Sequence, residues 1–136
     1  MSRTQAREIA YKMLFSNQFL NNGFEESVFV EILDGQKCSE TDMEFIKSIV
    51  VGVQEYSSEL QEIISRNLSA YKFERLFSAD KVALLLCVYE MIYCQDTPKK
   101  VAINETLNLV KKYSTEKSVA FVNSVLSKIY KEISNE

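Results

Sequence analysis

Apolar residues recur with the period of an α-helix along nearly the whole chain, and this periodicity constrains the fold more than any other feature. Side chains three and four positions apart share one face of a helix, so stripes at that spacing indicate helices with one buried side. Glycine (3) and proline (1) are scarce among the 136 residues. Few sharp turns are therefore available, which argues against a many-stranded β fold and favours helices joined by short connections.

The periodicity predicts about seven helices in one compact all-α domain that spans residues 1–136. They cover approximately residues 3–20, 25–33, 39–53, 58–68, 79–94, 98–113 and 117–133. The segment 79–94 is apolar nearly all round and is expected to be the most buried helix, with Ser78 as its N-cap. Asp34-Gly35 is expected to end the second helix, because both residues tolerate the left-handed backbone.

Composition places the chain among globular proteins, with 46% hydrophobic and 26% charged residues. No apolar run approaches the roughly 18 residues of a membrane-spanning helix. The N-terminal segment MSRTQAREIA lacks the apolar core of a signal peptide. The three cysteines form no C-x-x-C pair and are interpreted as free thiols in a reducing compartment. We therefore expect a cytoplasmic protein that does not enter a membrane.

Charge is unevenly distributed, although the net charge is only −3. From Glu25 to Glu62 there are ten acidic residues against two lysines, whereas from Lys99 to Lys131 there are seven lysines against two glutamates. The N-terminal segment adds Arg3, Arg7 and Lys12 against one glutamate. If the first and last helices lie close together, their charge could bind a polyanion locally even though the protein as a whole is acidic.

Signals for catalysis and metal binding are missing from the sequence. The chain has no histidine, which is the commonest general base and metal ligand. It has no glycine-rich phosphate loop and no cysteine pair with zinc-site spacing. Glu90, set in an apolar run, is interpreted as a buried hydrogen-bond acceptor rather than a catalytic acid. We expect no catalytic residue, no metal and no cofactor.

Aromatic residues lie off the apolar stripes of the two basic ends. Phe121 lies opposite the stripe of the last helix, beside Lys117, and the first helix carries Arg3, Arg7 and Tyr11 on a flank with Phe15 farther round. One interpretation is a second buried face within a helical bundle. The other is recognition of single-stranded RNA, in which bases stack on aromatic rings and basic side chains meet phosphates. The RNA interpretation requires the outer sides of the first and last helices to form one basic, aromatic surface.

Four segments resemble the NusB family of bacterial transcription antitermination proteins. The N-terminal RTQAREIA followed by LF resembles the family's opening, and DKVALLLCVYEM resembles its central helix. PKKVAINETLNLVKKYS and SVAFVNSVL resemble its two signature helices, usually written V-A-I-N-E-A and F-V-N-G-V-L. The segments occur in the family's order and cover nearly the full length of the chain.

The resemblance implies an all-helical fold of two three-helix sub-bundles, usually given as seven helices, and no catalysis. It implies binding of a short single-stranded RNA element, boxA, in nascent ribosomal RNA. Binding would occur together with the small-subunit ribosomal protein NusE, within an RNA polymerase complex that reads through terminators. Carried over by position, the RNA-binding residues are Arg3, Thr4, Arg7, Lys117, Ser118 and Phe121. Phe15 and Asp80 are the positions that would meet the NusE-type partner.

The sequence departs from the family pattern at several positions. Thr4 and Gln5 stand where arginines are common, so the N-terminal segment carries fewer positive charges than in many relatives. Lys117 takes a position that is acidic in some relatives. Ser124 replaces the usual glycine and Thr106 the usual alanine. The family includes monomers and dimers, and the resemblance leaves open whether the RNA-free protein is a homodimer.

Two other functions fit the same residues. A related domain is fused in front of RNA cytosine methyltransferases, where it helps to hold the substrate. A helical adaptor that binds proteins without contacting RNA would instead place the off-stripe aromatic residues in a partner's groove.

Overall fold

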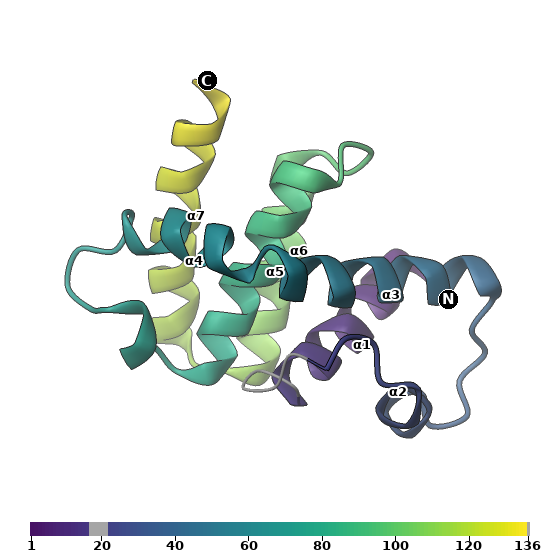
Figure 1. Ribbon diagram of the computed structural model, residues 1–136. Helices are drawn as coiled ribbons and strands as arrows, with labels where there is room; N and C mark the ends of the chain where they lie inside the picture. Colours follow the sequence, from purple (N-terminus) through teal and green to yellow (C-terminus); the bar gives the residue numbers. More distant parts are fainter. Residues whose placement is uncertain (17–21, 136) are drawn as a thin grey trace. The chain divides into compact units, whose positions relative to one another are not determined.

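The computed structural model describes residues 1–16 and 22–135 (Figure 1). Within these residues the protein contains seven α-helices and one short 3₁₀ helix, η1, and no strand. The predicted all-α fold is therefore confirmed. The chain divides into two compact units, Met1–Glu55 and Tyr56–Glu136.

The first unit consists of three helices, α1 (Arg3–Ser16), α2 (Glu26–Leu33) and α3 (Glu40–Glu55). Helix α1 packs against both α2 and α3 (Figure 1). The predicted first helix begins where expected, and its last predicted residues, 17–20, lie outside the described residues. The apolar stripes supply most of the buried side chains of this unit, among them Ala6, Ile9, Ala10, Met13, Leu14, Phe29, Ile46, Ile49, Val50 and Val53.

Residues with a left-handed backbone conformation and hydrogen bonds from a side chain to the backbone shape the connections of the first unit. Asp34 (φ 48°) and Gly35 (φ 77°) end α2, as their sequence predicts. Gly23 also has a positive φ, of 68°. Its N–H donates to Oε1 of Gln54 at 2.7 Å, and Nε2 of Gln54 donates to its carbonyl at 3.2 Å. One side chain of α3 thereby satisfies both backbone groups of Gly23.

The second unit contains α4 (Ser57–Ser65), η1 (Phe73–Arg75), α5 (Ser78–Tyr93), α6 (Lys99–Tyr113) and α7 (Glu116–Ser134). Helix α5 packs against α4, α6 and α7 and is the central helix, as its apolar sequence predicts (Figure 1). Its buried side chains are Asp80, Val82, Ala83, Leu84, Leu86, Cys87, Val88, Glu90 and Met91. The first unit is a three-helix bundle, whereas this unit has four α-helices. The additional helix is α4, which belongs to this unit because it buries Leu60, Ile63 and Ile64 against its neighbours.

Helix starts agree with the sequence in part. Ser39 accepts a bond from the N–H of Asp42 at α3, and Thr115 accepts one from the N–H of Ser118 at α7, each at 3.1 Å. The prediction that Ser78 caps α5 is wrong. Phe77 occupies the N-cap position without a side-chain bond, and Ser78 is the first helical residue. The backbone carbonyl of Phe77 already accepts the first bonds of the helix.

Polar and aromatic contacts join the far ends of the helices in the second unit. Nε of Arg66, at the end of α4, donates to Oε1 of Glu132 on α7 at 2.9 Å. The Tyr93 ring stacks on the Tyr56 ring with centroids 4.4 Å apart, and its hydroxyl lies 2.9 Å from both carboxylate oxygens of Glu59. Desolvation, followed by the bond to Glu59, raises the pKa of Tyr93 to about 12.

Candidate nucleic-acid interface

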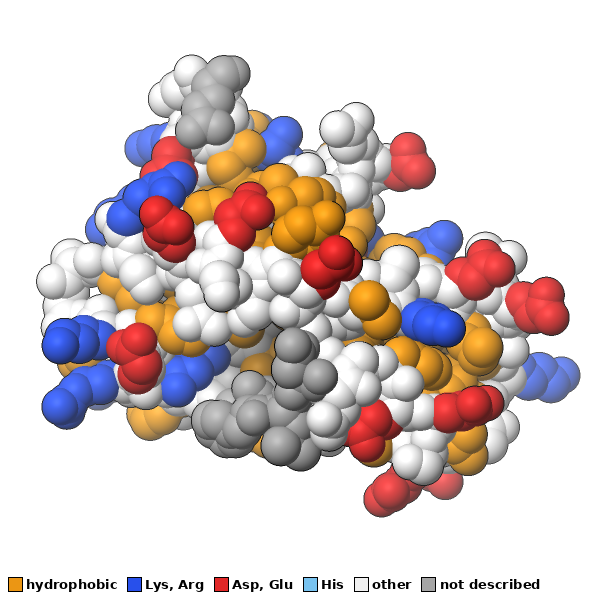
Figure 2. Space-filling model, viewed as in Figure 1, with side chains coloured by type: hydrophobic (Ala, Val, Ile, Leu, Met, Phe, Trp, Pro, Cys, Tyr) orange, Lys and Arg blue, Asp and Glu red, His pale blue; other side chains and the backbone are white. Residues whose placement is uncertain are grey.

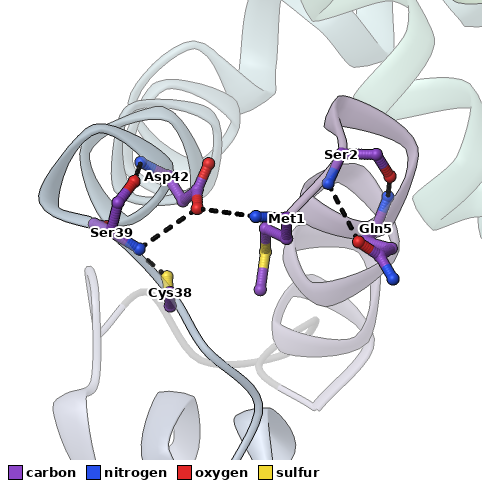
Figure 3. Close-up of polar contacts among 6 residues, drawn as sticks. All are labelled: Met1, Ser2, Gln5, Cys38, Ser39 and Asp42. Atoms are coloured by element: carbon purple, nitrogen blue, oxygen red, sulfur yellow. Dashed lines mark hydrogen bonds and ion pairs between the residues drawn. The ribbon is translucent and has the colours of Figure 1, made fainter.

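Reciprocal hydrogen bonds fix the start of α1, where three of the predicted RNA-binding residues lie. The Ser2 hydroxyl accepts from the N–H of Gln5 at 3.1 Å, and the Gln5 side chain accepts from the N–H of Ser2 at 2.9 Å (Figure 3). This exchange is a capping box, which satisfies two backbone donors that a helix start would otherwise leave unpaired. Arg3 and Thr4 therefore project from a well-defined first turn, and both are exposed.

The chain terminus is held on α3. The Met1 ammonium donates to Oδ2 of Asp42 at 3.2 Å, and the N–H of Ser39 donates to the same oxygen at 3.1 Å (Figure 3). These two bonds, that of Ser39 first, hold the pKa of Asp42 below its ordinary value. The contact ties the residues before α1 to the start of α3.

Both arginines of α1 lie over one ring of α3. The guanidinium carbons of Arg3 and Arg7 lie 4.0 Å and 5.8 Å from the Phe45 ring centroid, within the range of cation–π attraction. Arg3 is exposed, whereas Arg7 is only 5% exposed. The expected flank of α1 is thus mostly internal, since Tyr11 is also buried. Phe45 comes from a helix distant in sequence, so the pattern of α1 alone could not predict this burial.

In the second unit, Asp80 and Ser118 bind each other instead of facing solvent. The Ser118 hydroxyl donates to Oδ2 of Asp80 at 2.8 Å, and the Ser114 hydroxyl lies 3.1 Å from Oδ1. Asp80 is 3% exposed and Ser118 is 4% exposed. These bonds join the start of α5 to the start of α7, which lie at the same end of the unit (Figure 1). Both side chains, which the family resemblance assigned to partner and RNA binding, are therefore directed at each other within the second unit.

An open groove of about 530 Å³ lies beside this junction. It brings together the predicted Lys117 and Phe121 with residues that sequence analysis did not select. We call it the aromatic groove, and it is lined by Tyr71, Arg75, Leu76, Phe77, Asp80, Thr115, Lys117, Ser118 and Phe121. Phe121 is half-buried, so its ring lines a surface and is not sealed in the core.

Tyr71, Arg75 and Phe77 were missed because they lie in an irregular segment with no helical period. The signal that could have found them is the grouping of aromatic and basic residues in AYKFERLF. Figure 2 shows Lys and Arg side chains gathered over the connection from α4 to α5, with hydrophobic side chains beside them. Asp and Glu side chains gather instead over α2 and α3 of the first unit.

The remaining predicted residue is Phe15, near the end of α1, and its side chain is 43% exposed. Arg3, Thr4, Arg7 and Phe15 belong to the first unit, and the aromatic groove belongs to the second. Within residues 1–16 and 22–135, no helix combines the length and the hydrophobicity needed to span a membrane. In the same part of the chain, no three acidic or cysteine side chains are grouped to hold a metal ion.

The helices of the described residues present basic and aromatic side chains on open surfaces, as helical binding proteins do. The model of the NusB family matches residues 4–131, and the chain belongs to that family. As a member of the family it is a transcription antitermination factor and not an enzyme. The expected family and the expected lack of catalysis are thus confirmed.

Curated relatives and solved structures agree with this assignment. The chain is 37% identical to transcription antitermination protein NusB of Clostridium botulinum (strain Alaska E43 / Type E3), over 97% of this chain and 100% of the relative. It is 36% identical to the protein of the same name from Clostridium novyi (strain NT), over 96% of this chain and 99% of the relative.

Among solved structures, T. maritima NusB matches with a TM-score of 0.86 and 32% identity, over 97% of this chain and 92% of that chain. A crystal structure of the antitermination factors NusB and NusE in complex with double-stranded RNA matches with a TM-score of 0.81 and 29% identity. That match covers 97% of this chain and 99% of the other. The fold is therefore that of the NusB proteins.

Proposed function

We propose that this protein is a cytoplasmic antitermination factor that binds boxA-type single-stranded RNA of ribosomal RNA operons. Binding occurs together with the small-subunit ribosomal protein NusE, as part of an RNA polymerase complex. The observation that carries the proposal is the aromatic groove, in which Phe121 and Lys117 share one open surface. A structural neighbour crystallised with NusE and double-stranded RNA supports the choice of partners.

The proposed RNA contacts follow from exposure and charge. Arg3 and Thr4, both exposed on the first turn of α1, contact phosphate and ribose. Lys117 contacts phosphate, and Phe121 stacks on a base. For Arg7 and Ser118 we propose a different role from the one that the family pattern suggests. Since their side chains are buried, they hold the starts of α1 and α7 in place rather than meeting RNA.

The proposed partner contacts divide in the same way. Phe15 is exposed enough to pack against NusE. Asp80 is buried and bonded to Ser118, so it acts on the partner only by positioning the start of α7. In this proposal residues 1–136 work as one RNA-binding domain. RNA and NusE then strengthen each other's binding, as linkage requires. Without RNA, the same surfaces pair two copies of the chain as a homodimer.

A titration of a boxA-like RNA oligomer, with and without NusE and at two salt concentrations, tests the proposal. We expect tighter binding with NusE and weaker binding at high salt, because phosphate contacts release counterions. Phe121→Ala should weaken binding without unfolding the protein. Tyr130→Ala is the matched control, since it removes another half-buried ring of α7 that does not line the groove.

The same titration separates the alternatives. Binding of NusE with no RNA affinity under any condition would favour a protein–protein adaptor. RNA binding that NusE does not change would favour a substrate-holding domain of the kind related to RNA methyltransferases. Sedimentation of the RNA-free protein over a range of concentrations tests the homodimer.

A further inference from the structure

The aromatic groove is lined by more rings than the proposed RNA contact with Phe121 uses. Tyr71 and Phe77 are 61% and 68% exposed, more than any other large apolar side chain of the described residues. Single exposed apolar residues are normal on protein surfaces. Here, however, two of them share one groove with the half-buried Phe121, and such a grouping indicates a binding surface.

Tyr71 and Phe77 are exposed because nearby residues of the same segment are buried. Phe73 and Leu76, at the start and just past the end of η1, are buried. The N–H of Leu76 donates to the carbonyl of Phe73 at 3.1 Å, which closes the 3₁₀ turn. The carbonyl of Phe77 accepts from the N–H groups of Asp80 and Lys81, each at 3.0 Å. The backbone of Phe77 is therefore tied to the start of α5, and Tyr71 lies two residues before the buried Phe73, which lowers the entropy cost of binding a ligand.

The charges around the groove favour an anionic, planar ligand. Arg75 and Lys117 line it as two cations. Its one acidic residue, Asp80, is buried and bonded to Ser118. Glu74 and Glu116 are neighbours in sequence but do not line the groove. Aromatic faces between cations match a nucleotide, since the base offers a flat apolar surface and the phosphate carries the opposite charge.

We infer that Tyr71 and Phe77 form a second base-stacking position for single-stranded RNA, next to Phe121, and that Arg75 contacts a phosphate there. The inference rests on the proposed function and assigns it residues that the family resemblance did not supply. The groove volume of about 530 Å³ lies within the range of pockets that hold small ligands, roughly 300–1,000 Å³. An unpaired base has both faces available, whereas a base within a duplex is already stacked.

Ring substitutions in the full-length protein with NusE, titrated with a fluorescently labelled boxA-like RNA, test the inference. Phe77→Ala and Tyr71→Ala should each weaken binding about 5- to 150-fold, the range of one lost stacking contact. Phe77→Leu should weaken binding nearly as much, because leucine keeps apolar bulk but has no π face. Phe77→Tyr should retain binding, and Tyr130→Ala should leave it unchanged.

Abasic nucleotides placed one at a time along the RNA identify the stacked base. One abasic position should weaken binding to the native protein yet have no further effect on Phe77→Ala, because the two changes remove the same contact. Arg75→Gln should lower the slope of log affinity against log salt by about 0.7, the contribution of one phosphate contact to a single strand.

The outcomes separate this inference from the proposed function. If the native protein binds no RNA even with NusE, both fail. If it binds RNA and Phe121→Ala weakens binding while Phe77→Ala and Tyr71→Ala do not, only the second stacking position is wrong. If Phe77→Leu binds RNA like the native protein, or if Phe77→Ala loses NusE in the absence of RNA, the groove holds a protein side chain instead and the inference is overturned.

Discussion

The Ser118 hydroxyl donates a 2.8 Å hydrogen bond to the Asp80 carboxylate, and both side chains are buried at the junction of α5 and α7. This bond gives two residues of the family's functional pattern a structural role. It fixes the start of α7, from which Lys117 and Phe121 reach the aromatic groove. Positioning of the groove therefore depends on a hydrogen bond between two of its own lining residues.

Ser118→Ala should lower the free energy of unfolding by about 1–3 kcal/mol, because it removes one of the two hydroxyl groups that bond to the buried Asp80 carboxylate. Urea denaturation monitored by circular dichroism measures the change. Ser124→Ala is the control, since Ser124 is exposed on the same helix and the substitution changes helix propensity equally. Equal stability of the two variants would show that Ser114 alone satisfies Asp80.

Thr115→Ala should destabilise the protein by about 1 kcal/mol through loss of the α7 N-cap. Thr115→Ser should restore most of the loss, because serine keeps the accepting oxygen. Since Thr115 also lines the aromatic groove, RNA affinity should be measured on both variants. A destabilisation that serine does not rescue would mean that the threonine methyl group, rather than the cap bond, is what matters.

Asp42 should make the protein sensitive to acid. Its pKa is lowered in the folded state, so it contributes stability above its ordinary value of 3.8 and loses that contribution as the pH falls through the lower folded value. Asp42→Asn should therefore be less stable than the native protein at pH 7, and the gap should narrow below about pH 4. Thermal melts from pH 7 to pH 2.5 test this. A gap that stays constant with pH would contradict the ion pair with Met1.

Tyr93 should ionise at an unusually alkaline pH. Its pKa is raised from 10 to about 12, so its contribution to stability is complete below pH 10 and is lost as the pH rises through 12. Glu59→Gln should move this ionisation to lower pH, because it removes the charge that disfavours tyrosinate. Ultraviolet difference titration detects tyrosinate, and Tyr93→Phe assigns the signal. An unchanged titration in Glu59→Gln would mean that desolvation and the neighbouring Tyr56 and Tyr89, rather than Glu59, raise the pKa of Tyr93.

Lys117 and Arg7 should respond differently to loss of charge. Lys117→Gln should lower the salt slope of RNA binding by about 0.7 while leaving stability unchanged, as expected for an exposed phosphate contact. Arg7→Gln should instead destabilise the fold by about 1–2 kcal/mol, since it removes a buried cation from the Phe45 ring. Lys128→Gln, on the exposed side of α7, is the control for Lys117. If Arg7→Gln also lowers the salt slope of RNA binding by about 0.7, Arg7 contacts an RNA phosphate after all.

The sequence predicted the features that depend on local pattern. The helical stripes predicted the seven α-helices of the described residues, whereas the off-stripe position of Phe121 fitted both a buried face and a binding surface. The left-handed backbone of Asp34 and Gly35 could be predicted, because the tolerance for a positive φ is intrinsic to these residue types.

Features that depend on contacts between residues far apart in the sequence could not be predicted from the sequence pattern. Asp80 and Ser118 are 38 positions apart, and only the packing of α5 against α7 makes them partners. Arg7 is buried because α3 supplies Phe45 beside it. Tyr71 and Phe77 lie in a segment without periodicity, where alternation between buried and exposed residues is set by one 3₁₀ turn. Local pattern therefore defined the helices, whereas the groove required the tertiary structure.

The bond between the Met1 ammonium and Asp42 depends on a free amino terminus. An affinity tag joined to the N-terminus would turn that ammonium into an uncharged amide and remove the ion pair between Met1 and Asp42 of α3. Recombinant protein for RNA titrations should therefore carry its tag after α7, so that Arg3 is measured in its native setting.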